Sequence, residues 1–289
     1  VGWSSFSRDD YHSEHAFIWD AVNGMRDLGV LPGGYASTAS DINDLGQVVG
    51  TSWYDPSQVT RAFLWDPAGG IREIVGMYEA EAINNLSQVV GSSGPPDGPS
   101  YACLWNPDSG VVNLYRTFRA YGINNLSQVV GDGTMGAFIW DAAGEVRSLG
   151  TGLASSALDV NDLGQVVGHL KGVAFRWDAD SGVEPIPMTA AYGISNAGQV
   201  VGYYWNIPNP DAGPGQGAYV WSESTGMIQL STDANSAAYD INDAGQIVGM
   251  SGGHAVLWEP IPEPSSLAAL GLAVSGLGMA ALRRRRRSG

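Results

Sequence analysis

Short runs of apolar residues alternate with turns rich in Asn, Asp and Gly along most of this chain of 289 residues. One phrase, INNLSQVVG, stands unchanged at 83–91 and 123–131, and looser copies begin at residues 42, 160, 194 and 241. A second phrase, Ala followed by two mostly apolar residues and Trp, ends at Trp19, Trp65, Trp105, Trp140, Trp177, Trp221 and Trp258. The two phrases alternate strictly, so the chain repeats one unit whose tryptophans lie 35 to 46 residues apart.

Each unit has the pattern of four short strands. An apolar strand ending in Ile or Val is followed by a turn such as NDLG, a strand that starts QVVG, a variable loop, a strand such as AFLWD, a Gly-containing turn and a last strand. Asn accepts backbone hydrogen bonds within its own turn and Gly adopts a positive φ, so each turn closes a hairpin. Runs that are apolar on both sides indicate sheets covered on both faces.

These features predict an all-β fold, a β-propeller of seven blades with four antiparallel strands each, across residues 1–258. The repeat length also suits helical repeats, and the strand chemistry decides between the two. The first unit has the second to fourth strands and the last unit has the first to third, so these two units cannot combine into one blade. We therefore expect an incomplete seam, and we expect that residues before Val1, including a secretion signal, have been lost.

Composition limits the possible functions. Residues 1–282 hold nine basic against 29 acidic groups, a balance that should repel nucleic acid. Cys103 is the single cysteine, which excludes an intrachain disulfide. It stands where related strands have Phe, so we expect a small buried apolar side chain rather than a reactive thiol.

A different pattern follows Trp258. Residues 259–266 form a Pro-rich linker, residues 267–282 form an apolar run and residues 283–289 form an Arg-rich end, with Arg283, Arg284, Arg285, Arg286 and Arg287 as a membrane stop. The run predicts a short transmembrane helix of about 24 Å, less than the roughly 30 Å of a hydrocarbon core. The arginines favour the cytoplasmic side and would leave the repeat body outside.

This tail, a PEP motif followed by an apolar helix and terminal arginines, is similar to the PEP-CTERM sorting signal of Gram-negative bacteria. The resemblance covers about 28 residues in the order expected of that signal. It implies export, an intermediate anchored in the inner membrane, recognition by an exosortase and delivery to the cell surface or the extracellular matrix. Carried over residue by residue, Pro262, Glu263 and Pro264 are the sorting motif.

The body resembles the HAF-repeat family through the phrase His15, Ala16, Phe17 and its looser copies, across nearly all of residues 1–258. The family pattern is broken by Arg176 in AFRW, by Val256 in HAVLW and by Ser195 where other turns have Asn. The resemblance implies an extracellular repeat protein and gives no reaction.

The sequence contains few candidates for a metal-binding or catalytic site. The turns that begin at Asp41, Asp159 and Asp240 gather oxygen ligands that could hold Ca²⁺, although turn formation explains the same residues better. His12 and His15 would point to opposite faces of a strand, so a zinc site is not expected. Motifs of a nucleophile elbow, a P-loop or a dinucleotide site do not occur in the sequence.

The variable loops are the better candidates for function. Tyr54, Tyr203, Tyr204 and Trp205 could stack on sugar rings, and Asp55, Asp97 and Asp211 could accept hydrogen bonds from hydroxyl groups. The alternative is that these aromatic residues only cover the ends of strands.

We therefore predict a non-enzymatic propeller scaffold, exported and binding polysaccharide or other envelope components. A propeller glycosidase or lyase is the alternative, favoured by an acidic central channel and opposed by a channel plugged with Val, Ile and Trp. A purely structural matrix protein is a third possibility.

Overall fold

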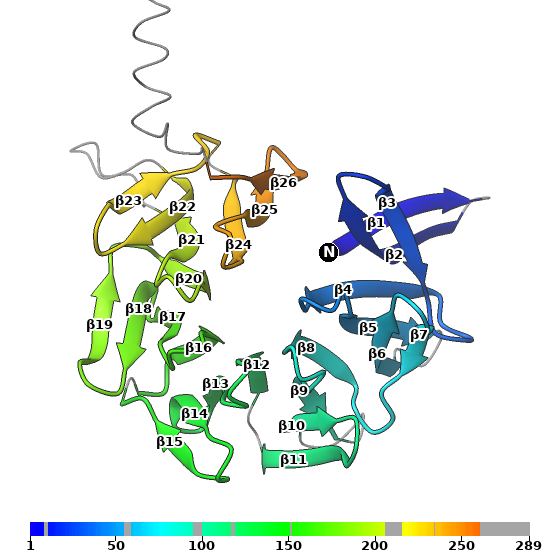
Figure 1. Ribbon diagram of the computed structural model, residues 1–289, viewed down its shortest axis with the longest axis horizontal. Helices are drawn as coiled ribbons and strands as arrows, with labels where there is room; N and C mark the ends of the chain where they lie inside the picture. Colours follow the sequence, from blue (N-terminus) through cyan, green and yellow to red (C-terminus); the bar gives the residue numbers. More distant parts are fainter. Residues whose placement is uncertain are drawn as a thin grey trace, which may run out of the picture. The chain divides into compact units, whose positions relative to one another are not determined.

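The computed structural model describes residues 1–8, 11–54, 59–94, 100–116, 119–150, 152–205, 216–233 and 235–260. Seven antiparallel sheets follow one another along this part of the chain around a common axis (Figure 1). Five of these described sheets have four strands, and the first and last have three. The predicted seven-bladed β-propeller is confirmed, and so are the incomplete first and last blades.

The blades are numbered in chain order, and every blade except blade 1 begins with its innermost strand. Blade 1 contains β1 (Gly2–Arg8), β2 (Tyr11–Asp20) and β3 (Gly24–Gly29). Blade 2 contains β4 (Ala36–Ile42), β5 (Val48–Tyr54), β6 (Val59–Asp66) and β7 (Gly70–Glu73). Blade 3 contains β8 (Glu79–Ile83), β9 (Val89–Ser93), β10 (Tyr101–Asn106) and β11 (Gly110–Arg116). Blade 4 contains β12 (Arg119–Ile123), β13 (Val129–Gly133), β14 (Gly136–Trp140) and β15 (Val146–Ser148).

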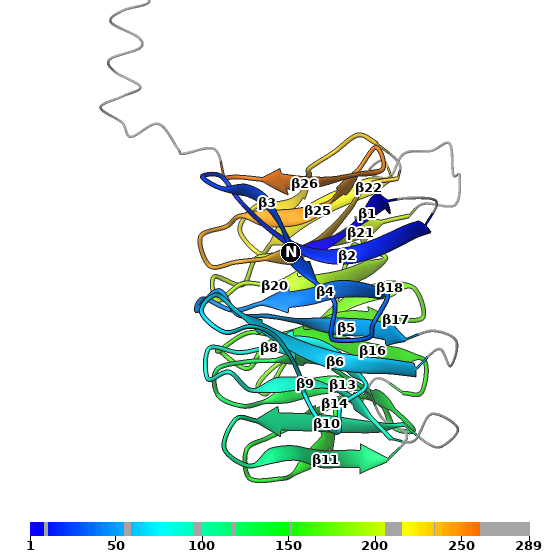
Figure 2. The ribbon, with the colours of Figure 1, turned by 90° about the vertical axis from the view of Figure 1, so that its right-hand side faces the viewer.

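The remaining blades repeat the same order. Blade 5 contains β16 (Ser155–Val160), β17 (Val166–Leu170), β18 (Val173–Asp178) and β19 (Gly182–Ile186). Blade 6 contains β20 (Ala190–Ile194), β21 (Val200–Tyr204), β22 (Gly217–Ser222) and β23 (Gly226–Gln229). Blade 7 contains β24 (Ala237–Ile241), β25 (Ile247–Ser251) and β26 (His254–Trp258). From the side, the strands run between two opposite faces of the ring (Figure 2).

The core lies between neighbouring blades. In blade 2, Val48 and Phe63 pack toward blade 1, whereas Val49 and Leu64 pack toward blade 3. Each strand therefore buries both faces, because successive side chains of a strand point in opposite directions. Cys103 belongs to the same core and is fully buried, as predicted. Burial raises the pKa of its thiol to about 12.

The repeat tryptophans lie in the third strand of each full blade, as predicted, and mark the outer part of the junctions. At four junctions an arginine of the preceding blade lies over the indole ring, with 5.0 to 5.9 Å between the guanidinium carbon and the ring centroid: Arg26 over Trp65, Arg72 over Trp105, Arg147 over Trp177 and Arg176 over Trp221. Such cation–π contacts tie one blade to the next.

The repeated phrase first closes its own turn. The side-chain oxygen of Asn84 accepts hydrogen bonds from the N–H groups of Leu86 (3.1 Å) and Gln88 (2.9 Å). Ser87 has a φ of 60°, at the position where other turns place a glycine such as Gly46. The prediction that the phrase forms a hairpin turn is confirmed.

The same phrase also binds the following blade, a role that the sequence analysis did not predict. The amide nitrogen of Asn84 donates to the backbone oxygen of Asn124 (3.0 Å), and the backbone N–H of Asn85 donates to Asn125 Oδ1 (2.8 Å). This pair of bonds recurs at three other junctions, where the donors are Asn43 with Asp44, Asn124 with Asn125, and Asn161 with Asp162. The phrase is thus both a turn and a clamp between blades.

The departures from the repeat pattern leave the strands intact. Arg176 is buried within β18 and pairs with Glu184 of its own blade and Glu223 of blade 6. The backbone oxygen of Ser195 still accepts the bond from Asn161, at 3.0 Å. Val256 lies within β26.

The tail predictions fall almost wholly outside the described residues. Val1–Leu257 form one compact unit and Trp258–Gly289 a second, of which the structure describes only residues 258–260. The sorting motif Pro262, Glu263, Pro264, the apolar run 267–282 and the five arginines 283–287 are not among the described residues. In the described ranges, no helix has the length and apolar character that a membrane crossing requires.

Candidate functional site

All six inner strands carry the same irregularity beside the axis of the ring. β4, β8, β12, β16, β20 and β24 surround the axis (Figure 1), and each skips one residue in its pairing with the following strand. The skipped residues are Ser40, Glu81, Tyr121, Leu158, Tyr192 and Tyr239. A β-bulge redirects a side chain out of the regular alternation of a strand. Each inner strand therefore presents one variable residue near the axis.

Three carboxyl groups lie immediately after these bulges, and we call Asp41, Asp159 and Asp240 the axial carboxylates. The corresponding residues of the other inner strands are Ala82, Gly122 and Gly193. In Asp41, Oδ1 accepts from the N–H of Ile42 (2.7 Å) and Oδ2 from the N–H of Ile83 in blade 3 (2.8 Å). Asp159 makes the equivalent bonds with Val160 (2.7 Å) and with Ile194 of blade 6 (2.8 Å).

The protein surroundings favour the neutral form of these carboxyl groups by raising their pKa values. Loss of hydration is the main cause, and the negative charge of Asp240 is the second; together they raise the pKa of Asp159 to about 7. The same two causes raise the pKa of Asp41. Loss of hydration also raises the pKa of Asp240, although its side chain remains accessible to water. The axis is therefore acidic at the level of these three residues.

A group of three tyrosines lies where blades 6 and 7 meet, and we call Tyr192, Tyr203 and Tyr239 the tyrosine group. The rings of Tyr192 and Tyr203 are stacked, with 5.7 Å between centroids and 17° between planes. The ring of Tyr239 also lies 5.7 Å from that of Tyr192, tilted by 52°. Burial, followed by the charges of the two neighbouring tyrosines, raises the pKa of Tyr192 to about 12, so its hydroxyl stays protonated. Tyr239 is exposed, and the other two side chains are partly exposed.

The four aromatic residues predicted to bind sugar do not form one site. Tyr203 belongs to the tyrosine group, whereas Tyr204 points to the opposite side of β21 and packs edge-on against the buried Tyr219, with 6.3 Å between centroids. Trp205 is 55% exposed just after β21, where its backbone exchanges hydrogen bonds with the Thr189 hydroxyl. Tyr54 lies in another blade under the guanidinium of Arg61, at 4.7 Å. The predicted partners Asp55, Asp97 and Asp211 lie outside the described residues.

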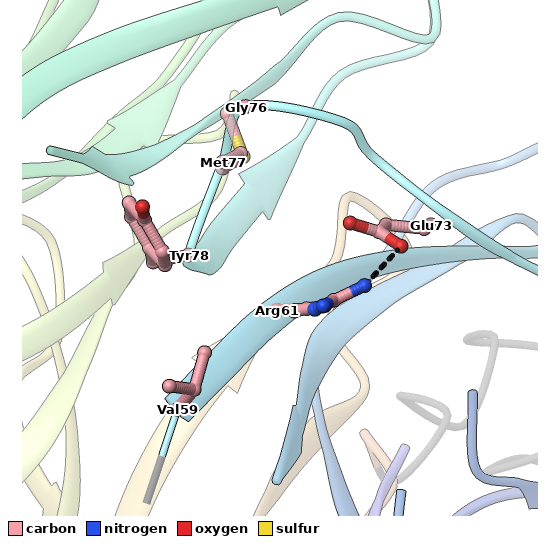
Figure 3. Close-up of a pocket in the computed structure, with 6 residues that line it drawn as sticks. All are labelled: Val59, Arg61, Glu73, Gly76, Met77 and Tyr78. Atoms are coloured by element: carbon pink, nitrogen blue, oxygen red, sulfur yellow. Dashed lines mark hydrogen bonds and ion pairs between the residues drawn. The ribbon is translucent and has the colours of Figure 1, made fainter. Parts of the chain in front are cut away.

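A hollow of about 290 Å³ lies between blades 2 and 3 (Figure 3). Its lining includes Arg61 and Glu73, which form an ion pair of 3.0 Å between neighbouring strands of blade 2, together with Val59, Met77 and Tyr78. The close-up shows Arg61 and Glu73 pointing toward one another (Figure 3). Because Arg61 and Glu73 neutralise each other in this ion pair, neither side chain offers a ligand an unpaired charge.

The described part of the chain does not supply the ligands expected for a metal ion. Among the described residues, no three His, Cys, Asp or Glu side chains lie close enough to share one. In the proposed calcium turn after Asp41, the side-chain oxygen of Asn43 accepts the N–H groups of Leu45 and Gln47. His15 pairs with Asp27 at 2.9 Å, and the side chain of His12 is outside the described part.

Sequence reasoning missed Tyr192 and Tyr239, although a signal was present. Tyr121, Tyr192 and Tyr239 each stand two residues before the Ile of the repeated phrase. Aligning the units on that Ile would have placed three tyrosines at the bulge position.

Comparisons with known proteins support the fold alone. No protein-family model and no curated protein matches the chain. Among solved structures, the chain is similar to the β-propeller domain of the Trilobed protease from Pyrococcus furiosus, whose structure reveals an open velcro topology. The identity is 12%, the match covers 78% of this chain and 83% of that one, and the TM-score is 0.55. A chain of the mitotic checkpoint complex matches 77% of this chain and 89% of its own length at 13% identity, and its TM-score of 0.33 carries no argument. The likeness to the first structure supports the β-propeller fold.

Proposed function

We propose that this protein is an exported, non-enzymatic β-propeller scaffold that binds polysaccharide through the tyrosine group. The observation that carries the proposal is the grouping of Tyr192, Tyr203 and Tyr239, contributed by three strands of two blades, in which the first two rings are stacked and the third is tilted. Flat aromatic faces with hydroxyl groups at their edges combine an apolar surface with hydrogen-bonding capacity. That combination suits a sugar ring, which presents C–H groups on its faces and hydroxyl groups around its edge.

The charge of the molecule narrows the class of polysaccharide. Residues 1–282 carry 29 acidic groups against nine basic ones, and one axial carboxylate, Asp240, directly follows Tyr239 in β24. A field of this sign repels anionic chains. We therefore propose that the ligand is a neutral polysaccharide.

Affinity electrophoresis of the full chain in gels that contain a neutral glucan or an anionic uronan tests this proposal. We expect retardation by the neutral polymer, and a loss of about tenfold in affinity, near 1.4 kcal/mol, on changing Tyr203 to Ala. Tyr35→Ala, which removes an exposed tyrosine just before β4 of blade 2, is the matched control. Equal retardation of the wild type and the Tyr203 variant would exclude the tyrosine group as the binding surface.

Export and sorting form a separate part of the proposal, based on the tail. We propose that exosortase recognises Pro262, Glu263 and Pro264 while the apolar run holds the chain in the inner membrane, and that the body then reaches the cell surface or matrix. The test is the intact mass and cell fraction of the full chain, preceded by a signal peptide, in hosts with and without an exosortase. A tail lost only with the enzyme present supports sorting, and an uncleaved chain in both hosts contradicts it.

An extracellular glycosidase or lyase remains a second candidate because of one observation. Three carboxyl groups with raised pKa values gather around the axis, and a raised pKa suits a general acid. In Asp41 and in Asp159, however, one oxygen already accepts the N–H of the next residue and the other accepts an N–H from the inner strand of the next blade, as expected of a structural role. Release of reducing ends from a glycan, lost in Asp159→Asn while binding persists, would favour the enzyme.

A further inference from the structure

We infer that Glu81, Arg119 and Tyr121, which we call the polar group, form a second sugar-binding subsite, and that one polysaccharide chain occupies this subsite and the tyrosine group together. The polar group belongs to blades 3 and 4, whereas the tyrosine group belongs to blades 6 and 7. The ligand at the polar group is a neutral sugar residue held through its hydroxyl groups. This inference rests on the proposed binding of polysaccharide by the tyrosine group and extends that site around the axis.

Equivalent positions of the repeated blade supply the two groups. In blade 6, Tyr203 stands opposite the residue that lies two positions before the bulge residue Tyr192. In blade 4, Arg119 lies two positions before the bulge residue Tyr121, and Asp132 stands opposite Arg119. Repeated blades place equivalent residues at the same level of the ring. The polar group therefore lies at the same level along the axis as the tyrosine group.

The bulge residues of neighbouring inner strands connect the two groups. β8, β12, β16, β20 and β24 follow one another around the axis (Figure 1). Their bulge residues, in the same order, are Glu81, Tyr121, Leu158, Tyr192 and Tyr239. None of these five side chains is buried. They form an arc beside the axis that has a polar end in blades 3 and 4 and an aromatic end in blades 6 and 7.

Glu81 and Arg119 carry charges that the surrounding protein leaves unpaired. Among the described residues, neither side chain forms an ion pair, and the carboxylate of Glu81 accepts no hydrogen bond. Burial, followed by the charge of Glu79, raises the pKa of Glu81, as expected of a carboxylate that lacks donors. The side chain of Arg119 is exposed. Because a carboxylate accepts hydrogen bonds and a guanidinium donates them, the two side chains together match the hydroxyl groups at the edge of a sugar ring.

Tyr121 is held in place by the neighbouring blade. Its hydroxyl donates to Asp132 Oδ2 (3.4 Å), and the same oxygen accepts a hydrogen bond of 2.6 Å from the hydroxyl of Ser156 in blade 5. Asp132 is thus a positioning residue that fixes the ring of Tyr121 between Glu81 and Leu158. A side chain that is already ordered loses less conformational entropy when a ligand binds.

Occupation of both groups by one chain requires a minimum chain length. An oligosaccharide too short to reach from Tyr239 to Glu81 binds at one group only. A longer oligosaccharide that is bound at the tyrosine group reaches the polar group as an intramolecular contact, which strengthens binding without a second association step. The affinity should therefore rise in a step as the oligosaccharide becomes longer.

Affinity electrophoresis of the full chain in gels that contain the neutral glucan measures the contribution of the polar group. We expect Glu81→Gln to lower the affinity about tenfold, because the amide has no charge and accepts fewer hydrogen bonds than the carboxylate. Arg119→Gln should lower it by a similar factor. Glu145→Gln, at an exposed turn on the opposite face of blade 4, is the matched control. The midpoint of thermal unfolding should not fall in Glu81→Gln, since this carboxylate has no bonding partner in the described part of the chain.

Oligosaccharides of the same glucan, added as competitors in order of increasing length, test whether one chain spans both groups. For the wild type we expect a step in inhibition at one length, and Glu81→Gln should abolish that step. The same dependence on length in both proteins would overturn the inference. Retardation that Tyr203→Ala weakens, while Glu81→Gln and Arg119→Gln do not, would also overturn it and leave the proposed function intact. No retardation of the wild type by the glucan would overturn both.

Discussion

The junctions between consecutive blades differ from the seam, which is the junction of blade 7 and blade 1, although the same sequence phrases lie at both. Asn161 clamps blade 5 to blade 6, while Asn242, in an equivalent turn, reaches no neighbouring blade within the described chain. Trp65 is almost buried between blades 1 and 2, whereas Trp19 of blade 1 is 49% exposed. Burial in this protein is thus set by the neighbouring blade and not by the local sequence, so identical substitutions should have unequal effects at the two places.

The largest difference is expected for glycine. Gly50→Ala places a Cβ 2.0 Å from the backbone oxygen of Thr38 and 2.9 Å from the Cα of Ala39, and backbone atoms cannot yield as a side chain would. We expect a loss of more than about 4 kcal/mol in the free energy of unfolding, or no folded protein at all. Gly2→Ala should cost less than about 1 kcal/mol, since it meets only the Phe17 ring. Urea denaturation of both variants measures the difference, and similar losses would show that the seam is closed in solution.

The next difference concerns apolar packing. Leu64 is fully buried between blades 2 and 3, so Leu64→Ala leaves a cavity and should cost about 3 kcal/mol. Leu257, at the same position of blade 7, is 40% exposed, and Leu257→Ala should cost about 1 kcal/mol or less. The midpoint of thermal unfolding ranks the two variants. A larger effect at Leu257 would contradict an open seam.

A third difference depends on pH and involves Asp159, which lies in blade 5, away from the seam. Its folded-state pKa, about 7, is above the unfolded value, so between these two values the native chain binds more protons than the unfolded chain. The free energy of unfolding therefore falls as the pH rises from 5 to 8. We expect Asp159 to contribute about 2 kcal/mol to this fall, allowing for the water that reaches the axis.

Denaturation at pH 5 and pH 8 measures that contribution. Asp159→Asn removes the titrating group, so the fall in stability should become smaller by that amount. Asp108→Asn, at an exposed turn outside the inner strands, is the control and should leave the pH dependence unchanged. An unchanged dependence in Asp159→Asn would mean that the carboxylate is as well hydrated in the native state as in the unfolded chain.

Much of the architecture was predictable because every blade repeats the same sequence pattern. The paired phrases gave the strand count, the place of the tryptophans and the incomplete end blades, since hairpin turns and strand alternation are local properties. The second role of Asn84 was not predictable, because its partner, the Asn124 carbonyl, is a backbone group that leaves no trace in the sequence.

The candidate site was predictable only in part. Tyr203 was identified because it stands beside other aromatic residues at the end of a strand. Tyr192 and Tyr239 come from different blades and contact each other only because a β-bulge turns one residue out of each inner strand. Tyr204, also predicted to bind ligand, lies on the other side of the strand, where it is partly buried and packs against the core. The contacts of a ring-shaped fold lie between units, and single-unit patterns do not encode them.

The smallest expected difference separates the hydrogen bond that Asn84 makes to the next blade from the hydrogen bonds that it makes within its own turn. Asn84 and Asn242 make the same bonds within their own turns, and Asn84 adds one bond across the junction, at 3.0 Å, from a buried position. Asn84→Ala should therefore cost about 1 kcal/mol more than Asn242→Ala, the contribution of one buried hydrogen bond. Chemical denaturation gives both values, and Asn84→Asp separates the roles, because aspartate keeps the turn acceptor and loses the donor to Asn124. If Asn84→Asp and Asn84→Ala lower the free energy of unfolding by equal amounts, the lost hydrogen bond to Asn124 explains the effect. If Asn84→Asp lowers the free energy of unfolding no more than Asn242→Ala does, the hydrogen bond to Asn124 adds nothing, and the apolar surfaces alone hold the blades together.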